Sequence, residues 1–273
     1  MRSREQFPAS KLLWAGRIIS GLMVAFLVMD GVMHLTKIAP VVQASERLGF
    51  PISLAVPLGV LELVCTVIYL YPATSVLGAI LLTGYLGGAV AMHLRVGSSL
   101  FGEMLFPVYI GVLLWLGLYF RGVRLAGSPA LPASKKTLWT GRVVSVVPAL
   151  LILFASIPKL LKAAPMIEGF RQYGFPEQTV VVVGIIELAC TVIYLVPRSR
   201  ILGAILMVGL MGGATATNVR VGNPSGIVTV ILGVLVWLGL YLRDVRLRAL
   251  LPVANSNRKQ DQSYAENNPV PVV

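Results

Sequence analysis

The chain contains a tandem repeat of one apolar unit. Residues 62–72 read ELVCTVIYLYP and residues 187–197 read ELACTVIYLVP, so nine of eleven positions agree at a shift of 125. The match reaches from Trp14 and Trp139 to Trp115 and Trp237, where the shift has fallen to 122. An internal repeat of this length constrains the fold more than any single motif, because both halves must adopt one architecture.

The composition places both copies in a membrane. Hydrophobic residues make up 56% of the chain, charged residues only 12%, and the mean hydropathy is +0.83. Soluble domains carry about 25% charged residues, so an ordinary soluble domain is excluded. The apolar runs show no alternation of polar and apolar positions, which favours membrane-spanning helices over barrel strands.

Each copy holds four apolar runs close to the roughly 20 residues that span a bilayer as a helix. The predicted fold class is therefore an all-α membrane protein with eight transmembrane helices. Because the number of spans in each copy is even, the two four-helix repeats should be parallel, about a pseudo-twofold axis along the membrane normal. The expected spans are 17–36, 52–71, 75–94, 104–120, 141–159, 178–196, 200–218 and 226–242.

Basic residues orient the predicted bundle. Most of the 23 Lys and Arg residues fall on the side that holds both termini and the central linker. Short basic loops stay cytoplasmic, so both termini should be cytoplasmic in a bacterial inner membrane. The net charge of +12 then faces anionic lipid, and nucleic acid is not an expected partner.

The predicted organisation has five parts, of which two are repeats. The linker is rich in turn residues, and the tail lacks apolar periodicity and should be disordered. The parts are an N-terminal segment 1–13, a first repeat 14–121, a linker 122–138, a second repeat 139–248 and a tail 249–273.

Several motifs resemble the DoxX-like family. They are LGFP at 48–51, a Glu within the second span, LGAILL at 77–82 and GGA at 87–89. The family takes its name from a subunit linked to quinol oxidase and thiosulfate:quinone oxidoreductase systems. The resemblance implies an inner-membrane protein of four-helix units, tied to quinone or thiol redox chemistry and to other subunits of a membrane redox complex. It implies no agreed catalytic motif, so it does not decide whether the chain is an enzyme.

Glu62 and its counterpart Glu187 should lie near the middle of the bilayer. An ionisable group there costs about 2.5–3.5 kcal/mol on insertion scales, so it should face the bundle interior. Cys65, Thr66 and Tyr69 follow Glu62 on the same helical face. The functional interpretation is a proton-accepting carboxylate beside a phenol that contacts a quinone headgroup. The structural alternative is a protonated Glu bonded to a neighbouring helix, and the two Cys residues favour simple packing.

A second polar group of residues should lie near the outer ends of the first and third spans. Asp30 and His34 share a helical face with Lys37, and His93 and Arg95 end the third span on the same side. In a packed bundle these groups would rim a cleft with Glu62 as its floor. Two His residues without a fixed ligand set predict no tightly bound metal.

The second copy departs from this pattern, so proton chemistry should favour the first copy. Ala155, Lys159 and Asn218 stand where the first copy has Asp30, His34 and His93. The alternative for the basic residues is that they extend to the membrane interface. Those residues are Lys37, Arg95, Lys159, Lys162 and Arg220.

The third span of each copy carries GxxxG, at 84–88 and 209–213. This spacing lets two helices approach closely. The two motifs could form the seam between the halves or pack within one copy.

Two functions from different classes follow. The first is a redox accessory protein that binds a quinone in the first copy, with Glu62, Asp30 and His34 handling protons and Tyr69 in contact. The second is a small-solute transporter or non-catalytic scaffold, in which the Glu residues secure helix packing or hold a solute.

Overall fold

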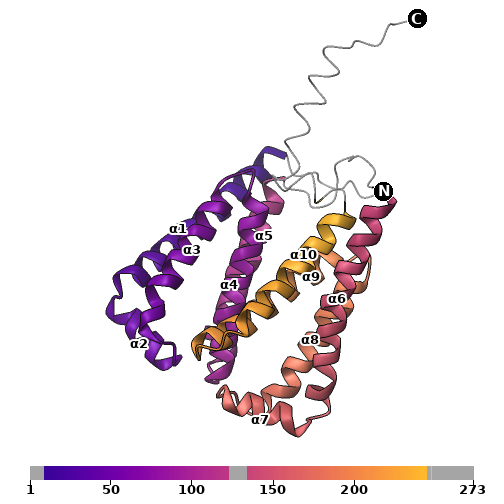
Figure 1. The fold of residues 1–273 in the computed structure, drawn as a ribbon. Coiled ribbons are helices and arrows are strands. Elements are labelled where there is room, and N and C mark those ends of the chain that lie inside the picture. Colours follow the sequence, from indigo (N-terminus) through magenta and orange to yellow (C-terminus); the bar gives the residue numbers. More distant parts are fainter. Residues whose placement is uncertain (1–8, 123–133, 245–246, 248–273) are drawn as a thin grey trace, which may run out of the picture.

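The computed structural model describes residues 9–122, 134–244 and 247 (Figure 1). Most of the expected N-terminal segment, most of the linker and all of the tail 249–273 lie outside these residues, so their structure stays a prediction. All the secondary-structure elements of the described part are helices, joined by short turns and loops.

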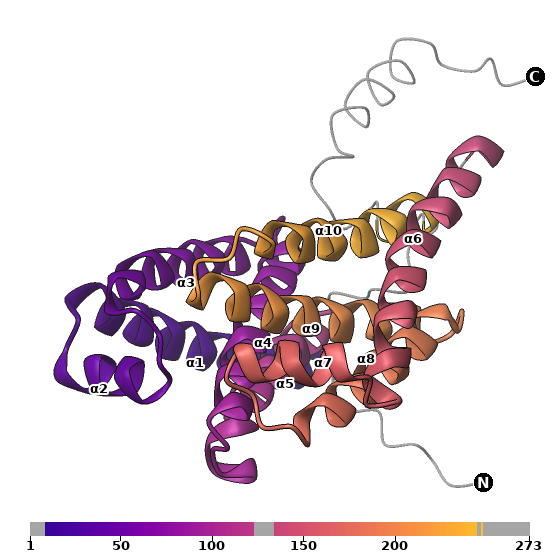
Figure 2. The same cartoon turned by 60° about the horizontal axis from the view of Figure 1, so that its bottom comes forward.

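The first repeat contains five α-helices and two short helical turns. They are α1 (Ala9–Thr36), α2 (Ala39–Arg47), the 3₁₀ turn η1 (Ile52–Leu54), α3 (Ala55–Leu70), α4 (Ser75–Arg95), the π-helical turn η2 (Leu100–Met104) and α5 (Phe106–Phe120). The second repeat contains α6 (Lys135–Leu160), α7 (Ala164–Gln172), α8 (Thr179–Leu195), α9 (Arg200–Arg220) and α10 (Gly226–Arg243). Figure 2 shows the two halves side by side.

Seven helical segments of the described chain are long and apolar enough to cross a membrane. They correspond to seven of the eight predicted spans. The remaining one, 178–196, corresponds to α8, an apolar helix of 17 residues, whereas each of the seven segments has at least 18. The membrane class is therefore confirmed, while the count of eight spans and the twofold axis stay predictions.

Two short helices were not predicted. α2 and α7 begin with Pro in the first turn, where a missing N–H costs nothing, and both are too short to span a bilayer. α2 ends at Arg47, and Gly49, two residues later, has a φ of +58°; Gly49 N–H donates to Glu46 O and Phe50 N–H to Ser45 O. This is the Schellman pattern, which explains the Gly-Phe of the LGFP motif as a helix stop.

The seam between the repeats is formed by α4 and α9, which share the most extensive helix contact in the described chain. A Cβ on Gly87 would overlap the carbonyl of Gly209, and a Cβ on Gly212 would overlap the carbonyl of Gly84. The two GxxxG motifs therefore pack against each other, which settles the alternative left open by the sequence. Backbone contact replaces side-chain packing at this seam.

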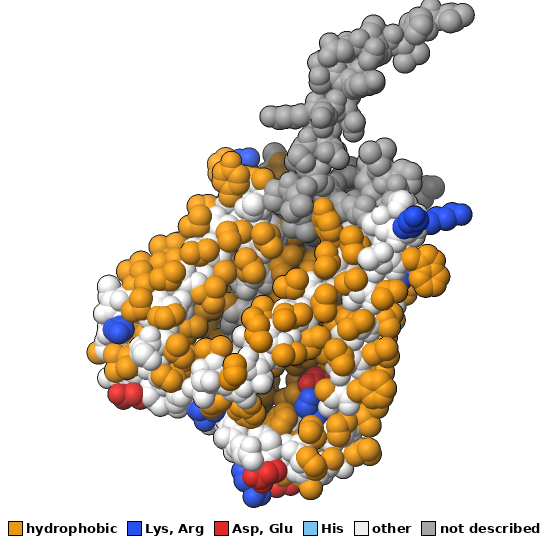
Figure 3. Space-filling model, in the orientation of Figure 1, with side chains coloured by type: hydrophobic (Ala, Val, Ile, Leu, Met, Phe, Trp, Pro, Cys, Tyr) orange, Lys and Arg blue, Asp and Glu red, His pale blue; other side chains and the backbone are white. Residues whose placement is uncertain are grey.

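The buried side chains form two clusters, one within the first repeat and one in the second repeat that also includes Val76 and Ile80 of α4. The first surrounds Tyr69 and Leu82, and the second surrounds Tyr194 and Met207. Large hydrophobic residues also cover the outside of the bundle (Figure 3). An apolar exterior of this extent is what lipid contact requires of a membrane-spanning bundle.

Candidate functional site

Helix α3 presents Glu62 to the bundle interior. Glu62 is 1% exposed, and Cys65, Thr66 and Tyr69 are buried on the same face. The predicted one-sided stripe is therefore confirmed. The same holds in α8, where Glu187, Cys190, Thr191 and Tyr194 are all buried.

Close packing of α1 on α3 brings two polar residues of α1 to Glu62. A Cβ on Gly59 would lie 2.7 Å from Gly31 O and 2.8 Å from the Cβ of His34. Because Gly59 has no side chain, the two backbones approach closely enough for short polar side chains to meet between them. Ligand-type atoms of Asp30, His34 and Glu62 all lie within 4.8 Å of one another.

The contacts within this cluster leave one atom without a partner. His34 Nδ1 lies 3.0 Å from the carbonyl oxygen of Asp30 and 3.6 Å from Asp30 Oδ2. Tyr85, on α4, donates from its hydroxyl to Glu62 Oε2 at 3.1 Å. Glu62 Oε1 is buried and has no hydrogen-bond partner among the residues that the structure describes. We call Asp30, His34, Glu62 and Tyr85 the acid cluster.

Tyr85 belongs to this cluster and was missed by the sequence reasoning. The sequence feature that could have identified Tyr85 is a difference between the copies, because Leu210 occupies the corresponding position in the second repeat. The same kind of difference had already singled out Asp30, which corresponds to Ala155.

The second repeat holds a closed ion pair in the corresponding place. Lys159 Nζ donates to both carboxylate oxygens of Glu187, at 2.5 and 2.7 Å. The side chains are 12% and 10% exposed. The alternative that Lys159 extends to the membrane interface is therefore wrong, because the buried carboxylate of Glu187 on α8 binds it directly.

Tyr69 and His93 are not brought to the acid cluster. Tyr69 follows Glu62 by seven residues, about two helical turns or 10 Å along the axis. Its hydroxyl lies 3.1 Å from Ser20 Oγ and donates to Leu114 O at 3.0 Å. His93 Nδ1 lies 2.9 Å from Ser98 Oγ, toward the end of α4. His93, expected on the rim of a cleft above Glu62, is therefore bonded to the loop that follows α4, and the cleft itself stays a prediction.

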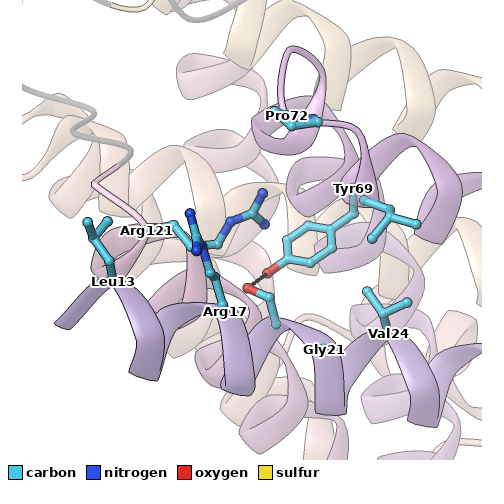
Figure 4. A pocket seen from close by; sticks show the side chains of 9 residues that line it. Leu13, Arg17, Gly21, Val24, Tyr69, Pro72 and Arg121 are labelled. Carbon is cyan, nitrogen blue, oxygen red and sulfur yellow. Dashed lines mark hydrogen bonds between the residues drawn. The ribbon is translucent and has the colours of Figure 1, made fainter. Parts of the chain in front are cut away.

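Tyr69 instead borders a pocket of about 380 Å³ near the start of α1 (Figure 4). The guanidinium groups of Arg17 and Arg121 lie on one side, and apolar side chains complete the walls. The lining residues are Leu13, Arg17, Ser20, Gly21, Val24, Tyr69, Leu70, Pro72 and Arg121. This is a small amphipathic hollow at the end predicted to be cytoplasmic.

The two cysteines are free and buried, with 3% and 5% of their surface exposed. Each lies three residues after its Glu, within the packed core of its repeat. Their placement agrees with the interpretation of Cys65 and Cys190 as small packing residues.

Comparison with known proteins supports the repeat and its family. The DoxX-like family model matches the chain twice, at residues 18–117 and 143–239. Searches of curated proteins and of solved structures gave no significant match. Because the two matched segments cover most of the chain and coincide with the two halves of the bundle, this integral membrane protein belongs to the DoxX-like family.

Proposed function

We propose that this protein is a membrane redox accessory whose first repeat takes up and releases protons for a lipophilic quinone. The observation that carries the proposal is the acid cluster, in which Glu62 is fully buried and its Oε1 has no hydrogen-bond partner within the described chain. An intramembrane ionisable group of this kind is a functional site by default.

The charge balance of the cluster supports a role in proton uptake. Asp30 and His34 can neutralise each other, but Glu62 then remains without a basic partner. No Lys or Arg of the described chain forms an ion pair with any of the three. The carboxylates of Asp30 and Glu62 lie within 4.8 Å of each other, and two negative charges at that distance repel strongly in a low-dielectric interior. We therefore expect the acid cluster to bind one proton, so that it carries only one negative carboxylate.

The second repeat supplies an internal comparison. Glu187 is buried at the equivalent depth, yet Lys159 already balances its charge. A carboxylate that is paired in this way needs no proton. We therefore assign proton handling to the first repeat and a structural role to the pair in the second.

The connection to a quinone rests on the family resemblance and on the pocket beside Tyr69. Small-molecule sites have volumes of about 300–1,000 Å³ and mostly apolar walls. A cavity of about 380 Å³ falls within that range, and its arginines would face the carbonyl oxygens of a headgroup. The quinone would then bind some two helical turns from Glu62, not against it.

The experiment that tests this function measures bound quinone. Wild type, Glu62→Gln and the double variant Lys159→Met with Glu187→Gln are purified in mild detergent, extracted with solvent and analysed by mass spectrometry. An unrelated membrane protein from the same cells sets the background, and size-exclusion profiles establish that each variant is folded.

The proposal expects near-stoichiometric quinone in the wild type, less in Glu62→Gln and an unchanged amount in the double variant. The double variant is the matched control, because it removes the other buried carboxylate together with its partner. Background quinone in the wild type would reject the redox role and favour the transporter or scaffold alternative.

A further inference from the structure

Arg95 and Arg220 end the two seam helices side by side. Arg95 is the last residue of α4 and Arg220 the last of α9. A Cβ placed on Gly49 would lie 2.8 Å from Arg95 Nη2 and 3.9 Å from Arg220 Nη1. The two guanidinium groups therefore meet at one place, on the side of the bundle predicted to face outward.

Each arginine is fixed by the loop that follows the short helix of its own repeat. Arg95 Nη2 donates to Leu48 O at 2.6 Å, and Arg220 Nη2 donates to Tyr173 O at 2.5 Å. Arg95 also reaches the other repeat, since a Cβ on Gly174 would lie 3.1 Å from its Nη1. Both guanidinium groups are thus held in place, not extended freely into the interface as the sequence alternative expected.

The positive charges at this place have no acidic partner within ion-pair distance in the described chain. Neither arginine takes part in any ion pair there, and the charged group that acts on Arg220 is Arg95. The Nε atoms of both are buried and have no hydrogen-bond partner among the described residues. Arg47, on the same side, differs in this respect, because it forms a two-point contact with the carboxylate of Glu103.

We propose that Arg95 and Arg220 together form a binding site for an oxyanion at the outer end of the seam. A guanidinium presents a rigid fork of N–H donors that matches phosphate, sulfate and carboxylate oxygens. Two forks held at one place can bind one tetrahedral anion, which removes the repulsion between them. The anion is either a free phosphate-like ion or the phosphate of a membrane lipid. This site is separate from the acid cluster and does not depend on its function.

The test compares both sources of the anion in purified protein. In the first arm, sulfate and phosphate are titrated into lipid-free detergent solution at constant ionic strength, with chloride as the reference, and the melting temperature is followed. In the second arm, native mass spectrometry measures retention of phosphatidylglycerol against phosphatidylcholine. The variants are Arg95→Gln with Arg220→Gln, and the control Lys37→Gln with Lys162→Gln.

The control removes one exposed positive charge from each repeat on the same side, so it matches the loss of charge without touching the site. A saturable stabilisation by sulfate or phosphate indicates a free oxyanion, and selective retention of phosphatidylglycerol indicates a lipid. In either case the arginine variant should bind at least tenfold more weakly, and the lysine variant should bind like the wild type.

Where the arginine variant does not fold, Arg95→Lys with Arg220→Lys takes its place, since it keeps the charge and loses the fork. It should bind measurably more weakly than the wild type. The proposal is overturned when neither anion source acts on the wild type, or when the lysine control loses as much binding as the arginine variant.

Discussion

Replacing Lys159 with Met tests the ion pair of the second repeat quantitatively. The pair is buried, with side chains 12% and 10% exposed, so the substitution leaves Glu187 charged in an apolar core. Breaking a buried pair from one side costs about 3–5 kcal/mol. The loss has an upper limit, because Glu187 can become neutral by binding a proton instead of staying charged. Protonating an ordinary Glu carboxyl at pH 7 costs about 3.7 kcal/mol. We therefore expect a loss of about 3–4 kcal/mol in the free energy of unfolding.

The matched variant is Lys159→Met combined with Glu187→Gln, which removes the charge that the single change strands. It should recover most of the loss, because no uncompensated charge remains in the core. Unfolding in detergent, followed by intrinsic fluorescence across a denaturant series, measures both. The loss in the single variant should shrink toward acidic pH, where Glu187 becomes neutral. Equal stability of the single and double variants at pH 7 would refute the assigned ion pair.

Three further predictions concern the seam, the acid cluster and the surface. Gly212→Ala should destabilise the bundle by about 2 kcal/mol or more and weaken the contact between the repeats, because the new Cβ would overlap the backbone of Gly84. The control Gly21→Ala places its Cβ in open space, so it should be neutral or stabilise the protein by up to about 1 kcal/mol. Thermal unfolding measures both variants. Tyr85→Phe should cost about 1–3 kcal/mol in unfolding experiments, because it removes the only hydroxyl that donates to Glu62 within the described chain. Arg47→Gln should leave the unfolding free energy close to that of the wild type, because its ion pair with Glu103 is exposed to solvent.

The membrane fold could be predicted from the sequence because the bilayer sets the length of each apolar run. The duplication then fixed the division into two repeats, and the buried stripe around Glu62 followed from helical periodicity. The seam was left open, since GxxxG shows that a helix packs closely without naming its partner. Only the observed contact between Gly87 and Gly209 identifies that partner.

The site itself was predicted in part. Asp30, His34 and Glu62 meet as expected, because residues at matching depths on adjacent helices face one another. Tyr85 was missed, since periodicity gives the face of one helix but not its rotation relative to the next. Tyr69 lies on the predicted face of α3 but about two helical turns from the cluster. Lys159 was misinterpreted for a related reason: its buried partner lies on a different helix.

The measurement that tests the central claim most directly is infrared spectroscopy of the carboxylic acid C=O band at neutral pH. The account predicts a protonated carboxyl in the wild type that is lost in Glu62→Gln and kept in Lys159→Met with Glu187→Gln. A wild-type spectrum without that band, or a band that survives Glu62→Gln, would contradict the assignment of a proton to the acid cluster.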